Sequence, residues 1–174
     1  MNLSERCKKI RAIVLDIDGV LTDGRIGYGV GSAEEIKFFC VRDGHGIVLA
    51  RRAGIKVGIL SGRRSAANAT RAAELKLDFI YQGELDKKSG FELLLKEQEL
   101  TAEECCYVGD DVVDIPPLKR AGFAVIVGDA PEYLESYAHY RAKACGGRGA
   151  VREAIELILR EKGLWEDAMR RYQQ

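Results

Sequence analysis

The sequence predicts an α/β fold, namely a doubly wound (Rossmann-like) parallel sheet flanked by helices. Short apolar runs rich in β-branched residues recur along the chain, helical patterns separate them, and polar residues or glycines follow each run. Strands that alternate with helices form parallel sheets through right-handed crossover connections. The length of 174 residues fits one domain with a full hydrophobic core, so residues 1–174 are assigned to a single unit.

The apolar runs and the helical patterns are expected to alternate from the first strand onward. Residues 1–11 form a short polar lead, and residues 41–46 are polar and glycine-rich, so they are expected to form a loop before the first helix. Strands are expected at 12–15, 55–60, 78–81, 105–108, 123–127 and, for a short sixth one, 140–142. Helices are expected from 47 to about 54, from Ser65 to Leu75, from Lys87, from Pro116 to Gly122, and after the glycine loop at 146–149.

Two segments lie outside this alternation. Residues 25–30 and 35–40 each place apolar side chains at every second position, and Gly29, Gly31 and Ser32 mark a turn between them, which is typical of a β-hairpin at about 25–40. A two-stranded hairpin is marginally stable alone, so it needs a partner surface. The C-terminal loop and tail, at about 145–174, contain an amphipathic helix and a last amphipathic segment.

Composition restricts the classes of function. Lys and Arg number 27 and Asp and Glu number 27, and this balance argues against bulk nucleic-acid binding and against binding to an anionic membrane surface. The N-terminal residues lack an apolar signal core, and apolar runs are too short to span a membrane, so we expect a cytoplasmic protein. The five cysteines include no C-x-x-C pair, which argues against a disulfide framework or structural zinc.

Polar side chains follow four of the predicted strands. Asp16 and Asp18 follow the first strand, and Ser61 and Arg63 follow the second. Lys87 comes shortly after the third. The fourth strand is followed by three carboxylates, namely Asp110, Asp111 and Asp114. In a doubly wound sheet the carboxyl ends of the strands meet at one crevice, so these groups are expected to form one site.

This set of groups suits phosphoryl transfer. Mg²⁺ prefers oxygen ligands, and Asp16 and Asp110 are the expected ligands, with the backbone carbonyl of Asp18 as a further candidate. Lys87 offers a positive charge to a phosphate, and Ser61 with the N–H groups after it can hold phosphate oxygens. We expect Asp16 to attack phosphorus, and Asp18 to protonate the leaving oxygen and then activate the hydrolytic water.

Two further carboxylates have open roles. Asp111 either contacts the metal or orients Lys87 or a metal-bound water. Asp114 either contacts the metal or caps the helix at Pro116.

The motifs, taken together, resemble those of the haloacid dehalogenase superfamily of phosphatases. In chain order they are Asp16-x-Asp18-Gly19-Val20-x-Thr22, then Ser61, then Lys87, then Gly109-Asp110-Asp111-x-x-Asp114. Further pieces resemble the 3-deoxy-D-manno-octulosonate (KDO) 8-phosphate phosphatases within that superfamily, at 16–24, 41–44, 62–63, 81–83, 86–87 and 146–153. The resemblance implies a Mg²⁺-dependent sugar-phosphate phosphatase of lipopolysaccharide precursor synthesis that acts as a homotetramer.

The resemblance also implies a set of substrate-binding residues. It places Arg42, Asp43, Gly44, Arg63, Arg71 and Lys87 around the sugar phosphate, and we count Asp18, Gly62 and Arg148 with them. Such a substrate carries a carboxylate, which an arginine can bind through two parallel hydrogen bonds. The candidates for this contact are Arg42, Arg63, Arg71 and Arg148. Arg148 lies in a glycine-rich loop that could reach the site of a neighbouring subunit.

The spacing of the motifs leaves no room for a cap domain over the site. Asp18 and Ser61 are 43 positions apart, an interval filled by the hairpin, a helix and a strand. Lys87 and Asp110 are 23 positions apart, an interval filled by one helix. An open site excludes water poorly, so a large substrate or a neighbouring subunit is expected to cover it. This argument supports the homotetramer independently.

Two other functions are compatible with parts of the pattern. One is a phosphatase for a nine-carbon ulosonic acid 9-phosphate or another sugar phosphate, including a domain severed from a bifunctional sugar-activating enzyme. The other is a receiver-type phospho-switch that holds its phosphate without turnover. The order of the motifs argues against a receiver, because Lys87 precedes the second acidic cluster.

Overall fold

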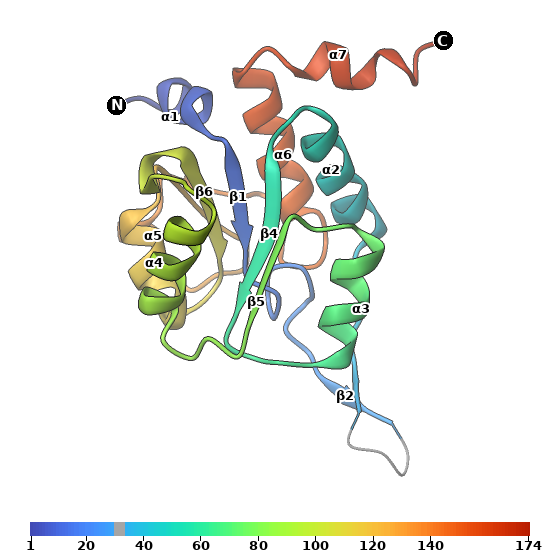
Figure 1. The fold of residues 1–174 in the computed structure, drawn as a ribbon, viewed down its shortest axis with the longest axis vertical. Coiled ribbons are helices and arrows are strands. Elements are labelled where there is room, and N and C mark those ends of the chain that lie inside the picture. The colour runs from blue at the N-terminus through green and yellow to red at the C-terminus, as the bar shows by residue number, and fades with distance from the viewer. Residues whose placement is uncertain (30–33) are drawn as a thin grey trace.

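The computed structural model, which describes residues 1–29 and 34–174, contains a six-stranded parallel sheet (Figure 1). Its strands stand in the order β5-β4-β1-β6-β7-β8. The chain winds from β1 outward to β5 and then returns to the other side of β1, so the direction of winding changes between β1 and β6. The sheet is therefore doubly wound, as the sequence predicted. The strands are β1 (Ala12–Leu15), β4 (Lys56–Ser61), β5 (Phe79–Gln82), β6 (Cys105–Gly109), β7 (Phe123–Ile126) and β8 (Tyr140–Arg141).

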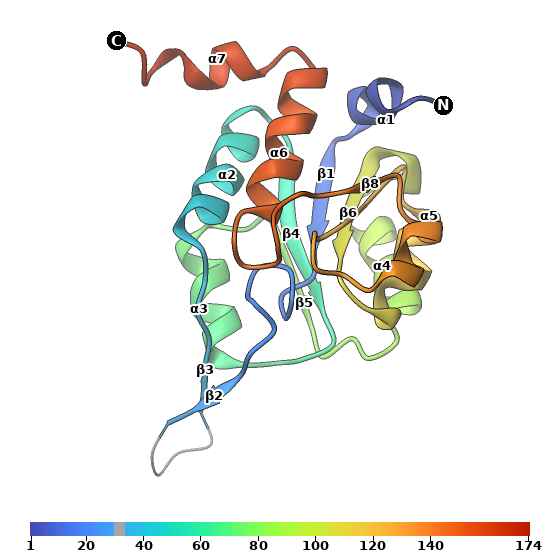
Figure 2. The same cartoon turned by 180° about the vertical axis from the view of Figure 1, so that it is seen from behind.

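Helices cover both faces of this sheet. In Figure 1, α2, α3 and α6 lie on one side and α4 and α5 on the other, and Figure 2 shows the same layers from behind. Every residue of β1, β6 and β7 is buried, as expected for strands covered on two faces. The helices are α2 (Val41–Arg52), α3 (Ala66–Glu74), α4 (Lys87–Glu97), α5 (Ile115–Arg120) and α6 (Ala150–Glu161).

The predicted helix starts after β4 and β5 have local causes. Ser65 caps α3 by accepting a hydrogen bond from the N–H of Asn68, and Asp86 caps α4 by accepting one from Lys88. Because Asp86 is the cap, Lys87 becomes the first residue of α4. This places the lysine close to the carboxyl ends of the strands.

Two segments expected to lack helix are helical. Residues 1–11 include α1 (Leu3–Lys9), which Asn2 and Glu5 start with a reciprocal capping box. Helix α2 begins at Val41, so residues 41–46 are its first turns rather than a loop. Glycine is tolerated there because α6 packs closely: a Cβ added to Gly46 would lie 2.9 Å from Cδ of Arg152. Such a tertiary contact leaves no local signal in the sequence.

The predicted hairpin is present but its strands are shorter than expected. Among the residues that the structure describes, β2 (Gly27–Tyr28) and β3 (Glu35–Ile36) pair as an antiparallel sheet of their own. The expected strand end at Val30 and the turn at Gly31 and Ser32 lie outside the described residues. Figure 1 shows the hairpin projecting at the end of the sheet to which β1 points, opposite the two termini.

The remaining elements are short. They are α7 (Trp165–Arg170) and the 3₁₀ helices η1 (Ala102–Glu104), η2 (Val112–Asp114) and η3 (Glu132–Tyr137). Among the described residues, the intervals β1–β4 and β5–β6 hold only the hairpin, helices α2 and α4, and η1, so the expectation of no cap domain is confirmed there. Over the same residues, every helix is too short or too polar to cross a membrane.

The glycine loop before α6 packs against the loop that follows β1. The N–H of Gly147 donates to the carbonyl of Val20 at 2.8 Å. A Cβ added to Gly146 would lie 1.7 Å from the carbonyl oxygen of Gly19, so only glycine fits this contact. The C-terminal loop therefore supports the segment that carries Asp16 and Asp18.

We expect Gly146→Ala to lower the free energy of unfolding by about 1–3 kcal/mol, because the added methyl group forces two backbone segments apart. Gly27→Ala is the matched control, since its Cβ would make an ordinary contact 3.6 Å from Cβ of Ile36. Urea denaturation followed by circular dichroism measures both. An unchanged midpoint for Gly146→Ala would show that the two loops separate freely.

Candidate active site

The groups that follow β1, β4, β5 and β6 gather around one cavity of about 550 Å³. The structure thus brings together eight residues that the sequence singled out, namely Asp16, Asp18, Ser61, Gly62, Arg63, Lys87, Asp110 and Asp111. Arg64, Leu85 and Val113 complete the lining. The cavity lies at the carboxyl ends of the parallel strands, beside the point where the winding changes direction.

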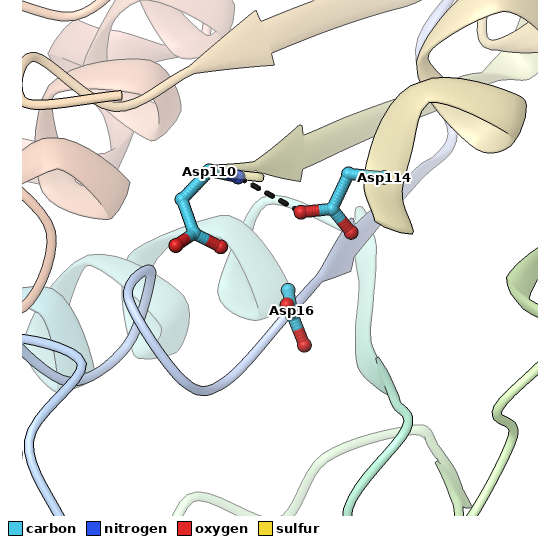
Figure 3. Close-up of side chains that lie close together, drawn as sticks. All are labelled: Asp16, Asp110 and Asp114. Atoms are coloured by element: carbon cyan, nitrogen blue, oxygen red, sulfur yellow. Dashed lines mark hydrogen bonds between the residues drawn. The ribbon is translucent and has the colours of Figure 1, made fainter. Parts of the chain in front are cut away.

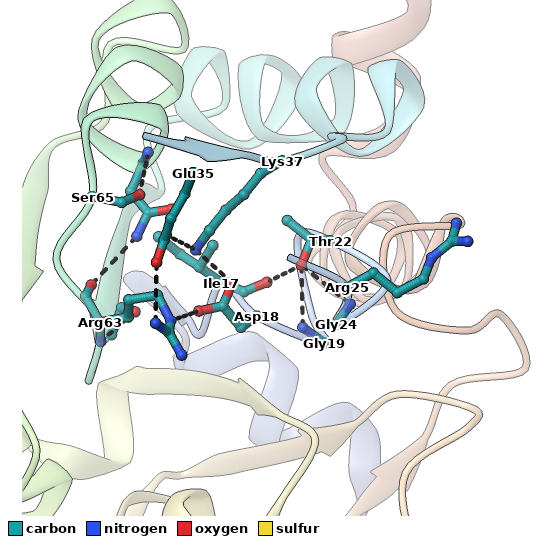
Figure 4. Close-up of polar contacts among 12 residues, drawn as sticks. Ile17, Asp18, Gly19, Thr22, Gly24, Arg25, Glu35, Lys37, Arg63 and Ser65 are labelled. Carbon is teal, nitrogen blue, oxygen red and sulfur yellow. Dashed lines mark hydrogen bonds and ion pairs between the residues drawn. The ribbon is translucent and has the colours of Figure 1, made fainter. Parts of the chain in front are cut away.

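The loop after β1 is held by Thr22, a buried residue of the first motif. Its hydroxyl accepts hydrogen bonds from the N–H groups of Gly19 and Gly24 and donates one to the carbonyl of Ile17, each at 3.3 Å (Figure 4). Gly19 has a φ of +89°, and a Cβ there would lie 2.0 Å from Oδ2 of Asp110. Glycine therefore permits both the turn and the close approach of the Asp110 carboxylate.

Lys87 is clamped between two carboxylates at the base of the cavity. Its Nζ lies 2.6 Å from Oδ2 of Asp16 and 2.6 Å from Oδ1 of Asp114. Its side chain is only 3% exposed. Burial opposes the charge of this ammonium, but the two neighbouring carboxylates outweigh it and raise the pKa of Lys87 above its usual value. The lysine therefore stays charged and ready to face a phosphate.

Asp114 orients its neighbours. Oδ1 accepts hydrogen bonds from Nζ of Lys87 at 2.6 Å and from the hydroxyl of Tyr107 at 2.7 Å. Oδ2 accepts from the N–H group of Asp110 at 2.9 Å (Figure 3) and from that of Asp111 at 3.3 Å. These four bonds fill the acceptor sites of a carboxylate, so Asp114 positions Lys87 and the Asp110 backbone. Its side chain makes no cap bond to α5, contrary to one of its two expected roles.

Asp111 lies at the rim of the cavity. Its carboxylate accepts a hydrogen bond from the N–H of Val112 at 2.7 Å and one from the hydroxyl of Tyr133 at 3.2 Å. Asp111 caps η2, and Lys87 is oriented by Asp114 rather than by Asp111. A role for Asp111 toward a metal-bound water remains a prediction.

The acidic side chains at the base of the cavity fit a divalent cation. Asp16, Asp110 and Asp114 each place a carboxylate oxygen within 4.8 Å of the others (Figure 3). Since Asp114 is saturated, Asp16 and Asp110 are the two that can ligate. Burial raises the pKa of Asp16 to about 6, against the opposing charge of Lys87. Burial and the charges of Asp114 and Asp16 raise the pKa of Asp110 to about 8. A bound cation would stabilise the ionised forms of Asp16 and Asp110. Their carboxylate oxygens are ligands that suit Mg²⁺.

A phosphate can be held opposite these carboxylates. Ser61 is buried, and its Oγ accepts a hydrogen bond from the N–H of Arg63 at 3.3 Å, which leaves the hydroxyl hydrogen for donation. Gly62, the next residue, also lines the cavity. Lys87 completes a set of donors around the position where a phosphate would meet Asp16.

Asp18 is held by two cations, one of which the sequence did not single out. Nζ of Lys37 lies 2.6 Å from Oδ1 of Asp18, and Nε of Arg63 lies 3.4 Å from Oδ2 (Figure 4). Sequence reasoning missed Lys37 because alternation in the hairpin marked it only as a polar position. It also missed Tyr107, which lies inside an apolar strand. Neither carries a local signal of its partner.

The other predicted substrate-binding residues lie apart from this cavity. Arg42 and Arg148 line a neighbouring groove of about 420 Å³ together with Phe38 and Phe39. Arg148 is 67% exposed, with its guanidinium 3.9 Å from the Asp23 carboxylate.

Three more of these residues have partners inside the protein. The buried Asp43 accepts hydrogen bonds from the N–H groups of Gly149 at 3.2 Å and Arg152 at 2.8 Å, at the start of α6. The guanidinium of Arg71 lies 5.6 Å from the centre of the Phe39 ring. A Cβ added to Gly44 would lie 2.4 Å from Nη2 of Arg71, so this glycine makes room for the arginine.

Comparison with known proteins gives a consistent set of relatives. The sequence profile of the haloacid dehalogenase-like hydrolases matches residues 41–122. The 3-deoxy-D-manno-octulosonate 8-phosphate phosphatase of Escherichia coli K12 is 40% identical over 163 residues, which cover 94% of this chain and 86% of that protein.

Solved structures agree with the sequence match. The 3-deoxy-D-manno-octulosonate 8-phosphate phosphatase of Yersinia pestis superposes with a TM-score of 0.90 at 40% identity and covers 94% of this chain and 88% of its own. The phosphatase of the same name from Moraxella catarrhalis, solved with magnesium, phosphate and KDO, has a TM-score of 0.92 at 36% identity, over 98% of this chain and 97% of its own.

The fold and the sequence both agree with these relatives over most of the chain. The chain therefore belongs to the haloacid dehalogenase-like hydrolases and, within them, to the family of the 3-deoxy-D-manno-octulosonate 8-phosphate phosphatases.

Proposed function

We propose that this protein hydrolyses KDO 8-phosphate to KDO and inorganic phosphate with Mg²⁺, through an aspartyl-phosphate intermediate, in lipopolysaccharide precursor synthesis. The observation that carries the proposal is the clamp of Lys87 between Asp16 and Asp114 inside a cavity that also holds Ser61 and Asp110. The relatives with this activity in their names cover most of the chain and support the substrate.

The residues divide the reaction into two displacements. A carboxylate oxygen of Asp16 attacks phosphorus, and the bond from phosphorus to the sugar oxygen breaks while Asp18 gives that oxygen a proton. Asp18 then takes a proton from a water molecule, which attacks the phosphoryl group and releases phosphate from Asp16. Ser61, the N–H of Gly62 and Lys87 hold the phosphoryl oxygens throughout. Asp16, Asp110 and the backbone carbonyl of Asp18 would hold Mg²⁺, which would supply the positive charge that this carboxylate-rich site needs.

The sugar part of the substrate would extend from the cavity toward its exposed edge. Arg63 is 45% exposed and lines the cavity, so it can bind the substrate carboxylate. Arg42 and Arg148 face the neighbouring groove, where they could complete the site of the same chain or of a second one. Asp43 and Gly44 would support the substrate indirectly, through α6 and Arg71.

We propose that the protein is a cytoplasmic homotetramer of single-domain chains in which a neighbour covers the site. We call β2, β3 and the residues up to Phe38 the hairpin stem. Tyr28 and Phe38 of this stem are 64% and 75% exposed, and contact with another subunit would bury them. The open cavity needs such a cover to exclude water. The absence of a membrane-spanning helix among the described residues is consistent with a cytoplasmic location.

Phosphate release from a panel of sugar phosphates tests the proposed activity. We expect turnover of KDO 8-phosphate only with Mg²⁺, and lower kcat/KM for nine-carbon ulosonic acid 9-phosphates. Asp16→Asn should reduce release to the level of buffer because it removes the nucleophile, while the exposed Asp167→Asn should behave as wild type. A protein that is phosphorylated once without turnover would instead be a receiver-type switch.

The affinity for Mg²⁺ is expected to depend on pH, because protons compete with the cation for two carboxylates. Below the pKa of Asp110, about 8, Mg²⁺ must displace one proton, so the dissociation constant should rise about tenfold per pH unit as pH falls. Below the pKa of Asp16, about 6, the rise should become steeper. Titration calorimetry at pH 7 in buffers of different ionisation enthalpy should detect release of about one proton per ion. Affinity that is constant with pH would contradict this.

Light scattering tests the assembly. We expect the mass of four chains, and we expect Phe38→Asp to lower that mass and raise KM, because it places a charge in an apolar contact. A wild-type protein that is monomeric at assay concentration would exclude the shared cover.

A further inference from the structure

Four charged side chains form a closed ring at the side of the cavity. Asp18 contacts Lys37 at 2.6 Å and Arg63 at 3.4 Å, as described above. Glu35 closes the ring, with Oε1 3.0 Å from Nη1 of Arg63 and Oε2 3.5 Å from Nζ of Lys37. Figure 4 shows these side chains pointing toward one another from the loop after β1, the hairpin stem and the loop after β4. We call Asp18, Glu35, Lys37 and Arg63 the charge ring.

The members of the charge ring differ in exposure. The side chain of Lys37 is 0% exposed, whereas that of Arg63 is 45% exposed and lines the cavity. An ammonium taken out of water at this depth is strongly unfavourable unless carboxylates compensate its charge. An apolar side chain would fill the same space at lower cost. The presence of a buried lysine at this position is therefore better explained by its contact with Asp18 than by packing.

We propose that Lys37 is a positioning residue for the carboxylate of Asp18, with Glu35 as its counter-ion. The inference rests on the proposed function, because it needs Asp18 to be the acid and base of the reaction. Lys37 holds Oδ1 from the buried side. Arg63 holds Oδ2 and is also within reach of an anionic substrate. When the substrate engages Arg63, Oδ2 is released toward the reacting atoms while Lys37 keeps the carboxylate in place.

The position of Lys37 gives the hairpin a role in the chemistry. Lys37 follows β3 directly, and Glu35 belongs to β3. The stem of the hairpin thus reaches the side chain that transfers the proton, in addition to presenting an apolar surface. A displacement of the stem would move Asp18, and the rate of proton transfer falls steeply when donor and acceptor are misplaced.

Lys37→Met tests the inference with two substrates. The alkoxide of a sugar phosphate is a poor leaving group and needs the proton of Asp18, whereas the nitrophenolate of p-nitrophenyl phosphate leaves without one. We expect kcat for KDO 8-phosphate to fall about 10²-fold, in the range for loss of general acid–base catalysis. KM should change little. The pre-steady-state burst of nitrophenolate should keep its rate, and steady-state turnover should fall because Asp18 also activates the water.

A double-mutant cycle separates positioning from a general effect on structure. If Lys37 acts through Asp18, Lys37→Met should cause no further loss in an Asp18→Asn background. Multiplicative losses, or an equal loss of the burst and of KDO 8-phosphate turnover, would overturn the proposal. Lys96→Met, at an exposed lysine on α4, is the matched control and should behave as wild type.

Two further measurements keep the outcome decisive. Glu35→Gln leaves Lys37 in place but removes its counter-ion. It should lower kcat for KDO 8-phosphate less than Lys37→Met does and should leave the nitrophenolate burst unchanged. This variant tests the proposal even if Lys37→Met fails to fold. Equal losses on both substrates for Glu35→Gln would contradict the proposal. If the wild type is active and both Lys37→Met and Glu35→Gln have wild-type rates, this inference is overturned while the proposed function stands. A wild type inactive on both substrates would overturn the proposed function and this inference with it.

Discussion

Lys87 lies almost fully buried between Asp16 and Asp114, with its ammonium 2.6 Å from an oxygen of each. The three side chains come from α4, from the end of β1 and from η2 after β6, so this contact ties three segments together at the end of the sheet. Removal of one member of a buried ion pair typically costs about 3–5 kcal/mol, because the remaining charge is left unpaired. The same interaction therefore holds the strand ends in place and arranges the proposed nucleophile.

The balance of charge around this clamp sets the order in which ligands can bind. Asp16, Asp110 and Asp114, when ionised, carry more negative charge than Lys87 neutralises. Burial is the main cause of the raised pKa values of Asp16 and Asp110, and the neighbouring carboxylates add to it. A phosphate dianion would be repelled by such a site. A divalent cation reverses the balance, after which Lys87 and the cation can both attract the phosphate. We infer that the cation binds first and that the phosphate follows.

The sequence predicted what local patterns encode. Buried runs ending in Asp16, Ser61 and Asp110 identified the strands and their functional ends, because apolar periodicity and turn residues are local signals. It could not show that residues 41–46 are helical, because the fit of Gly46 against Arg152 depends on a helix more than 100 positions away. It also could not find Lys37, whose partner Asp18 lies 19 positions away, or Tyr107, whose hydroxyl contacts Asp114 from within an apolar strand. Side chains that act through another residue leave no motif of their own.

Asp43 lies behind the site and acts through another segment of the protein. Its carboxylate fixes the start of α6 through the N–H groups of Gly149 and Arg152. The loop that leads into α6 contacts the loop after β1 through Gly147 and Val20. A substitution of Asp43 would therefore shift Asp16 and Asp18 through α6 and the glycine loop, even if Asp43 does not contact the substrate. The segment that resembles a substrate-binding motif thus has a second role, which is to hold the proposed nucleophile from behind.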